Sequence, residues 1–263
     1  MEQTQLEVIR ESLKNRAEED YRKFSSGLLP GTEGILGVRL PVIRKLARQY
    51  AACGRRSAGH KAENHVSENG TEPENGYLGA QELLDQLEAA YREGRVFLFE
   101  ERLFWGILIG YASLSKEERV KRLNAFLPLI DNWSVCDSCC ITYKFMREDR
   151  VFWWNYLIGL FAAKEAFTVR FAIVCGLDFF IEENYVDTFL EILAGLKQDV
   201  YYVQMAQAWA LSMCYVAFPE RVKAVFTSGR LGDLVQNKTI QKIRESRQVS
   251  GEEKEALLSY RRA

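Results

Sequence analysis

Apolar residues recur at helical spacing along almost the whole chain, whereas the period-two alternation of a β-strand is nearly absent. The segment LEVIRESLKNRAEEDYRKF (6–24) has the pattern of an amphipathic opening helix. The segment LPVIRKLARQYAAC (40–53) has the pattern of a second helix, with Pro41 suited to the first turn. Similar segments follow one another from residue 78 to the C-terminus, so we expect an all-α protein of about a dozen helices.

One long stretch breaks the helical pattern. Residues 54–76, GRRSAGHKAENHVSENGTEPENG, are polar and have almost no apolar surface to bury. They predict a mobile loop inserted into a single domain that spans residues 1–263. Both histidines of the chain, His60 and His65, lie in this stretch.

An internal repeat of 34 residues organises the centre of the chain. It is seen when NWSVCDSCCITYKF (132–145), AFTVRFAIVCGLDF (166–179) and VYYVQMAQAWALSM (200–213) are aligned. Val135, Val169 and Val203 then coincide. One helix pair cannot bury its apolar face without a neighbouring pair, so the period predicts an α-solenoid. The Trp-Leu-Gly-Tyr signature of tetratricopeptides is missing, and we expect HEAT-like repeats forming a C-shaped solenoid with a concave face.

Three positions depart from the apolar pattern of the repeat. They are Asp137, Arg170 and Trp209, one in each consecutive unit. Equivalent helices of a solenoid line one wall, so these side chains are candidates for ligand contact. Trp133 lies four residues before Asp137, on the same helix face. Alternatively, the tryptophans belong to the core and Asp137 forms a structural ion pair with Arg170.

The cysteines offer a second candidate chemistry. In CDSCC the spacing of Cys136, Cys139 and Cys140 invites a zinc interpretation, but no second cysteine pair or nearby histidine completes a four-ligand site. Small buried thiols fit the helical pattern better, and no metal or organic cofactor is predicted. The six cysteines are too few and too clustered for a disulfide framework, which favours a reducing, cytoplasmic setting.

The net charge of −1 is unusual for a nucleic-acid-binding protein, but the charge is unevenly distributed. Residues 54–100 hold five Lys/Arg and nine Asp/Glu, whereas residues 219–263 hold ten Lys/Arg and six Asp/Glu. Basic residues near both ends are candidates for phosphate contacts, although such runs are often only solvated helix faces. The candidates are Arg39, Arg44, Lys45, Arg48, Lys242, Arg244 and Arg247.

Taken in order, several short motifs resemble the AlkD-like DNA alkylation repair family, the HEAT-repeat glycosylases that remove alkylated purines. The motifs are GVRLPVIRKLA (37–47), FEERLFWGILI (99–109), NWSVCD (132–137), TVRFAIV (168–174) and QMAQAWAL (204–211). The resemblance covers nearly the whole chain apart from residues 54–76. It implies that Trp133 and Trp209 flank the deoxyribose, that Asp137 faces the anomeric carbon, and that Arg170 holds the DNA backbone.

The resemblance implies a monofunctional glycosylase that acts on N3- or N7-alkylated purines in duplex DNA without a membrane or an obligate protein partner. Such purines are cationic and already good leaving groups, so the enzyme has chiefly to stabilise an oxocarbenium-like sugar. A carboxylate and aromatic faces can do this without a histidine. The alternative is a non-catalytic HEAT-repeat scaffold that binds nucleic acid or a protein partner in its groove.

Overall fold

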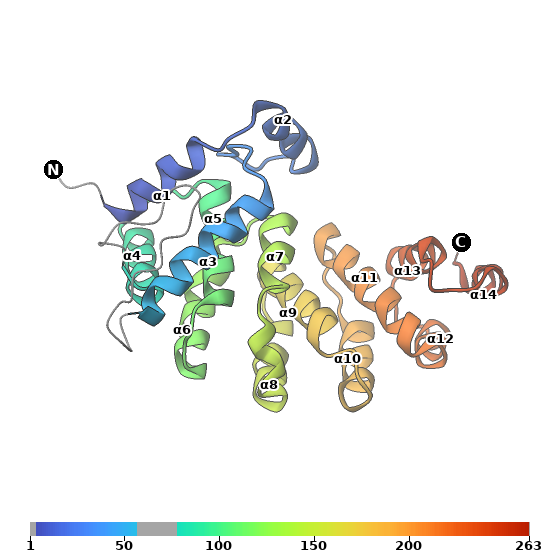
Figure 1. The fold of residues 1–263 in the computed structure, drawn as a ribbon. Helices are drawn as coiled ribbons and strands as arrows, with labels where there is room; N and C mark the ends of the chain where they lie inside the picture. The colour runs from blue at the N-terminus through green and yellow to red at the C-terminus, as the bar shows by residue number, and fades with distance from the viewer. Residues whose placement is uncertain (1–3, 57–77, 263) are drawn as a thin grey trace. The chain divides into compact units, whose positions relative to one another are not determined.

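The computed structural model describes residues 4–56 and 78–262, with the side chains of residues 54–56 left aside. Within these ranges the chain forms fourteen α-helices, three 3-10 helices and no β-strand, which confirms the all-α helical-repeat prediction (Figure 1). The chain divides into two compact units, Met1–Thr142 and Tyr143–Ala263, which we describe one at a time. None of the helices in the described ranges has the combination of length and hydropathy that crossing a bilayer requires.

The first unit consists of seven α-helices and one 3-10 turn in its described part. They are α1 (Gln5–Lys14), α2 (Glu19–Leu28), α3 (Leu40–Arg56), α4 (Ala80–Arg92), α5 (Phe99–Tyr111), α6 (Lys116–Phe126), η1 (Leu127–Leu129) and α7 (Trp133–Cys140). Helix α5 is the centre of this unit, since it packs against α3 and α7 and its residues Phe104, Trp105 and Ile107 are fully buried. The predicted polar loop lies outside the described residues, apart from residues 54–56, which belong to α3.

The prediction of one opening helix over residues 6–24 was wrong, because the structure contains two helices there. Helix α1 ends at Lys14, and the chain is extended at Glu18 (φ −118°, ψ 120°). The Glu18 N–H donates to the carbonyl of Gly37 (3.0 Å) instead of continuing a helical ladder. A contact between residues distant in sequence therefore interrupts a locally favourable helix.

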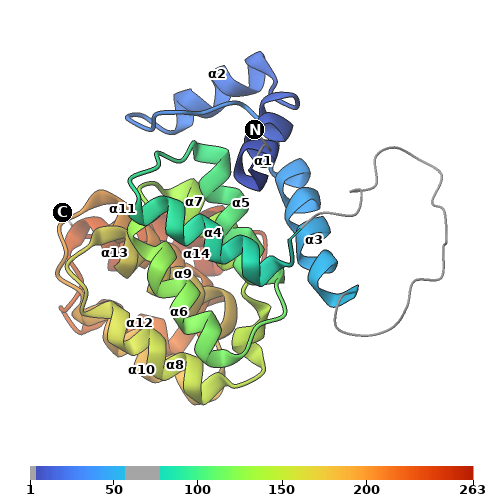
Figure 2. The same ribbon diagram turned by 90° about the vertical axis from the view of Figure 1, so that its left-hand side faces the viewer.

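The second unit is built from alternating helices in two rows. It contains η2 (Lys144–Arg147), α8 (Arg150–Phe161), α9 (Ala166–Phe179), α10 (Glu183–Gly195), α11 (Tyr201–Ala217), α12 (Pro219–Thr227), α13 (Asp233–Glu245), α14 (Gly251–Ala256) and η3 (Leu257–Tyr260). Helices α9, α11 and α13 pack side by side, and α8, α10 and α12 form the other row (Figures 1 and 2). Trp153 and Trp154 of α8 are buried among aromatic rings between these helices.

The internal repeat corresponds to real helices. Helices α7, α9 and α11 begin within one residue of the same repeat position, and Val135, Val169 and Val203 are all fully buried. In the first repeat, the helix ends before the end of the aligned segment (132–145). Helix α7 stops at Cys140, where the hydroxyl of Thr142 donates to the Cys139 carbonyl (2.6 Å). The first repeat is therefore shorter than the other two.

Candidate functional site

Helix α7 separates its buried residues from its partly exposed residues. Val135, Cys136, Cys139 and Cys140 are buried. The other four residues are half-buried: Trp133, Ser134, Asp137 and Ser138. The spacing of four residues places Trp133 and Asp137 on this second face, as expected for i and i+4 positions of a helix.

A chain of polar contacts fixes the start of α7. Asn132 is the N-cap, and its side-chain oxygen accepts a hydrogen bond from the Val135 N–H (3.0 Å). The Asn132 side-chain amide donates to Asp131 (2.8 Å), which in turn forms an ion pair with Arg102 of α5. Asn132 is only 5% exposed, so the cap is shielded from competing water. These three residues hold Trp133 and Asp137 at a defined place on the first unit, and none of them was among the predicted site residues.

Trp133 forms one wall of a cavity of about 110 Å³ in the first unit. Its indole N–H donates a long hydrogen bond to the carbonyl of Leu28 at the end of α2 (3.4 Å). Helix α2 also contributes to the lining, including Phe24 and Leu28, which are 60% and 49% exposed. Ser134 and Ser138 add hydroxyl groups to the lining. The cavity is therefore mainly apolar with a few polar groups.

Glu100 of α5 shapes the segment that leads into α3. Its carboxylate is fully buried and accepts hydrogen bonds from the N–H groups of Leu36 (2.9 Å), Gly37 (2.7 Å) and Val38 (3.2 Å). Gly37 has φ +92°, and a Cβ there would lie 2.5 Å from the Glu18 carbonyl oxygen. A glycine is therefore required at this turn. The buried Glu100 carboxylate therefore has a structural role, because it accepts hydrogen bonds from three backbone N–H groups.

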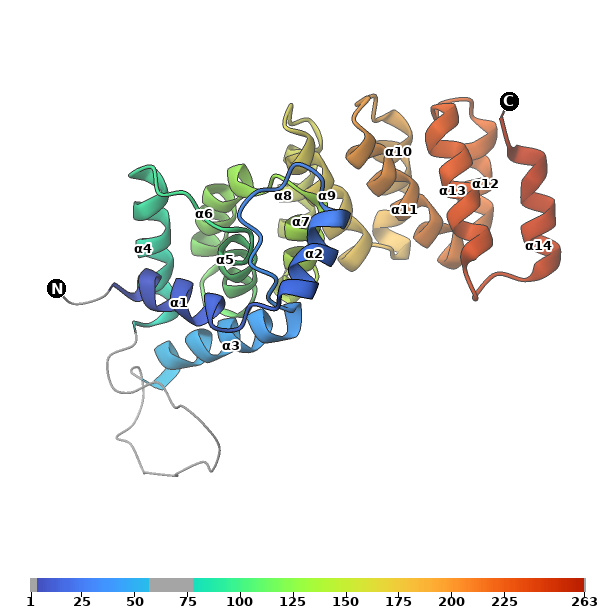
Figure 3. The same ribbon diagram turned by 90° about the horizontal axis from the view of Figure 1, so that it is seen from above.

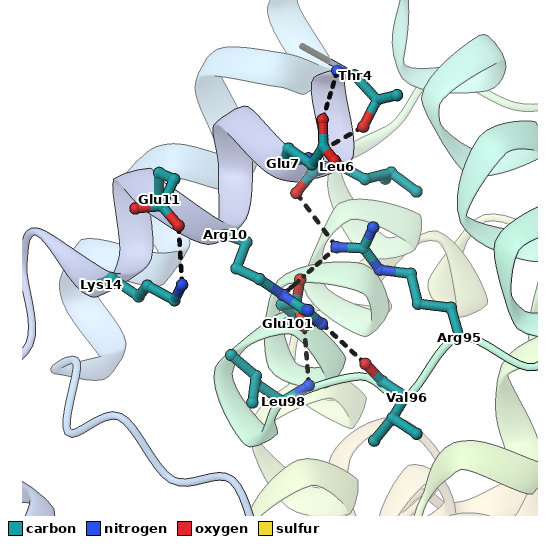
Figure 4. A network of polar contacts seen from close by, with 10 residues as sticks. All are labelled: Thr4, Leu6, Glu7, Arg10, Glu11, Lys14, Arg95, Val96, Leu98 and Glu101. Atoms are coloured by element: carbon teal, nitrogen blue, oxygen red, sulfur yellow. Dashed lines mark hydrogen bonds and ion pairs between the residues drawn. The ribbon is translucent and has the colours of Figure 1, made fainter.

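The neighbouring Glu101 ties α1 and the start of α5 together (Figure 4). Its carboxylate binds Arg10 (2.7 Å) and Arg95 (3.1 Å) and accepts from the Leu98 N–H (2.8 Å). Arg10 also donates to the Val96 carbonyl (2.8 Å). The Glu-Glu-Arg sequence of α5 therefore uses each of its three charges to position another segment of the first unit.

The second unit carries the other two predicted catalytic residues, Arg170 on α9 and Trp209 on α11. Arg170 is only 6% exposed, and its guanidinium donates to the carbonyl of Tyr202 (2.6 Å). Trp209 is half-buried. Phe171, which aligns with Asp137 in the repeat, is fully buried. Equivalent positions of the repeat therefore differ in exposure. Trp133 and Asp137 belong to the first unit, whereas Arg170 and Trp209 belong to the second.

The basic residues near the N-terminus have different surroundings. Arg39 pairs with Glu18 (2.9 Å) and lies 4.8 Å from the ring centre of Tyr21. Arg48 is exposed, lies 4.8 Å from the ring centre of Tyr111 and donates to its hydroxyl (3.1 Å). Lys45 is exposed and Arg44 is half-buried. Stacking on an aromatic ring leaves the charge of Arg48 partly accessible, whereas Arg39 forms an exposed ion pair with Glu18.

Among the C-terminal candidates, Arg244 and Arg247 are exposed and Lys242 is half-buried. Arg244 forms an exposed ion pair with Glu255 (3.2 Å). All three belong to the end of α13 or the turn that follows it. The second unit therefore presents basic side chains near its C-terminus.

All six cysteines are free thiols, and only Cys53 is not fully buried. Burial raises the pKa of the Cys139 thiol well above its usual value and raises the pKa of Cys214 to about 12. In the described ranges no group of three or more His, Cys, Asp or Glu residues is arranged to hold a metal ion. The CDSCC cysteines of α7 therefore pack as small apolar side chains.

The fold and the α7 site define the class of protein. It is an all-helical repeat protein with a tryptophan and a carboxylate on one capped helix. The model of the DNA alkylation repair enzyme family matches residues 9–226, so the chain belongs to that family. Neither the curated proteins nor the solved structures gave a significant match. Family membership supports an enzymatic role in DNA repair.

Proposed function

We propose that the protein is a monofunctional DNA glycosylase that hydrolyses the N-glycosidic bond of cationic N3- or N7-alkylated purines in duplex DNA. The family match over residues 9–226 supports DNA as the substrate. The single observation that carries the proposal beyond the family is the placement of Trp133 and Asp137 together on the half-buried face of α7. We further propose that the reaction takes place in the cytoplasm and needs no metal or organic cofactor.

The proposed chemistry follows from the charge of the lesion. An alkylated purine leaves as a neutral base, while positive charge develops on the deoxyribose. The Asp137 carboxylate stabilises that charge and orients the attacking water. Trp133 packs on the sugar, and its ring adds cation–π attraction of about 0.5–2 kcal/mol where water is excluded. No strong general acid is required, because the leaving group already carries the positive charge.

We also propose roles for Trp209 and Arg170 in the reaction, as the family resemblance implies. We assign Trp209 to the deoxyribose, where an aromatic face again favours developing positive charge. We assign Arg170 to a phosphate of the same strand, where a guanidinium can bind two oxygens. Arg170 is 6% exposed, and its hydrogen bond to the Tyr202 carbonyl orients the guanidinium. Phosphate contacts from the basic residues of α3 and α13 hold the duplex without reading its sequence.

The proposal is tested with a duplex that carries a single 7-methylguanine. We expect the protein to release 7-methylguanine and leave an abasic site, which hot alkali converts to a strand break. An undamaged duplex of the same sequence should give no break. A protein that binds either duplex and releases no base would instead be the non-catalytic helical-repeat scaffold.

A further inference from the structure

The C-terminal helices α13 and α14 line an open hollow of about 630 Å³. Helix α14 lies beside α13 at the end of the second unit (Figures 1 and 3). The family model ends at residue 226, so this hollow lies wholly outside the matched residues. Four cations and two carboxylates contribute to its lining: Lys238, Arg244, Lys254, Arg261, Glu245 and Glu255. The lining therefore carries a net positive charge in a chain whose net charge is −1.

The cations of the C-terminal hollow are only weakly neutralised. Arg244 pairs with Glu255 at 3.2 Å, but both side chains are exposed, and such pairs contribute little. Lys238 donates to the neutral side-chain oxygen of Gln241 (3.1 Å). Lys254 and Arg261 form no ion pair with any residue in the described ranges. An anion entering the hollow would therefore meet positive charge at little cost in broken ion pairs.

The segment that carries Arg261 is held firmly against α13. The Asn237 side chain both donates to the Arg262 carbonyl and accepts from the Arg262 N–H, each at 3.0 Å. Gln236, which is 2% exposed, donates to the Tyr260 carbonyl (2.6 Å). These bonds fix the backbone on both sides of Arg261. Ligand binding then has less backbone freedom to remove, which favours affinity.

We propose that the C-terminal hollow is a phosphate-binding site for the backbone of duplex DNA. Lysine and arginine side chains without neutralising partners are the residues that bind DNA phosphates. Helix α13 packs directly on α11, which bears Trp209. Neighbouring helix axes lie about 8–10 Å apart, which corresponds to roughly three base pairs of DNA. The site thus contacts phosphates a few base pairs from a nucleotide at Trp209. This inference rests on the proposed DNA substrate but not on base release.

The test compares two triple variants that remove the same charge. The first is Lys238→Gln, Lys254→Gln and Arg261→Gln in the hollow. The control is Arg221→Gln, Lys223→Gln and Arg230→Gln, whose native side chains form ion pairs with Glu183, Glu220 and Glu191 on α10 and α12. Dissociation constants for an undamaged duplex are measured at about 50–200 mM salt. Thermal melts verify that both variants are folded.

For the hollow variant we expect the slope of log Kd against log salt to fall by about 0.9 for each DNA phosphate that the variant no longer binds. The control should retain the wild-type slope. Equal slopes of log Kd against log salt for the two variants would overturn the proposed site. The proposal would also be overturned if the wild-type protein bound a polyglutamate peptide more tightly than DNA. Base release from the 7-methylguanine duplex is measured separately with wild-type protein. A changed slope without release rejects only the proposed function, whereas release with an unchanged slope rejects only the phosphate site.

Discussion

The N-cap of α7 offers a direct link between local structure and the proposed chemistry. Asn132→Ala removes both the hydrogen bond to the Val135 N–H and the bond to Asp131. Loss of an N-cap costs about 1 kcal/mol, and loss of a buried hydrogen bond to a charged group adds about 1–2 kcal/mol. We therefore expect the free energy of unfolding to fall by about 2–3 kcal/mol. Trp133 directly follows the cap, so its side chain should also shift.

The functional consequence should exceed the loss of stability. A displacement of about 1 Å in a catalytic arrangement can lower the rate by about 100-fold. The assay is single-turnover release of 7-methylguanine at a temperature where circular dichroism finds every variant folded. Asn132→Ser keeps a capping hydroxyl and should recover most of the rate. Guanidinium titration of each variant gives the free energy of unfolding on the same samples.

Ser115→Ala provides a matched control. Ser115 caps α6 in the same unit by accepting from the Glu118 N–H (3.2 Å), and α6 carries none of the proposed catalytic residues. This variant should lose about 1 kcal/mol of stability and keep the wild-type rate. The reasoning is refuted if Asn132→Ala retains the wild-type rate. It is also refuted if Ser115→Ala loses as much activity as Asn132→Ala does.

Two further predictions concern packing and thiol chemistry. Gly106→Ala should lower the free energy of unfolding by about 1–3 kcal/mol, because the added Cβ would overlap Cys139 and Phe126. Gly159→Ala, at a position with open space around it, should be neutral or stabilising. Denaturant titration measures both variants, and a wild-type midpoint for Gly106→Ala would contradict the prediction. Ellman's reagent at pH 8 should modify Cys53 first, since burial shields the other five thiols and raises the pKa of Cys139 and Cys214. A second thiol that reacts equally fast in the native protein would contradict this packing.

The repeat was the most informative part of the sequence. Its fixed phase located the starts of α7, α9 and α11 because each helix must bury the same apolar position against its neighbours. Local pattern failed where distant contacts decide the backbone. The hydrogen bond from the Glu18 N–H to the Gly37 carbonyl separates α1 from α2. Gly37 is not visible in the helical periodicity of residues 6–24.

The candidate site was partly predictable for the same reasons. The spacing of Trp133 and Asp137 placed them on one helix face, and both are half-buried there. The burial of Arg170 was not predicted, and one of its hydrogen-bond acceptors, the Tyr202 carbonyl, is a backbone group that no side-chain pattern reveals. Asn132 could have been recognised, since asparagine immediately before a helix is a common N-cap. The single-domain assignment and the roles of the four residues stay predictions.

The central claim is that the Asp137 carboxylate stabilises the sugar cation during base release. The decisive measurement is single-turnover release of 7-methylguanine by wild-type protein and by Asp137→Asn, each at saturating protein so that all of the duplex is bound. The account predicts rapid release by wild-type protein, and for Asp137→Asn a rate lower by about 100-fold or more with an unchanged dissociation constant. Equal rates for the two proteins would contradict it.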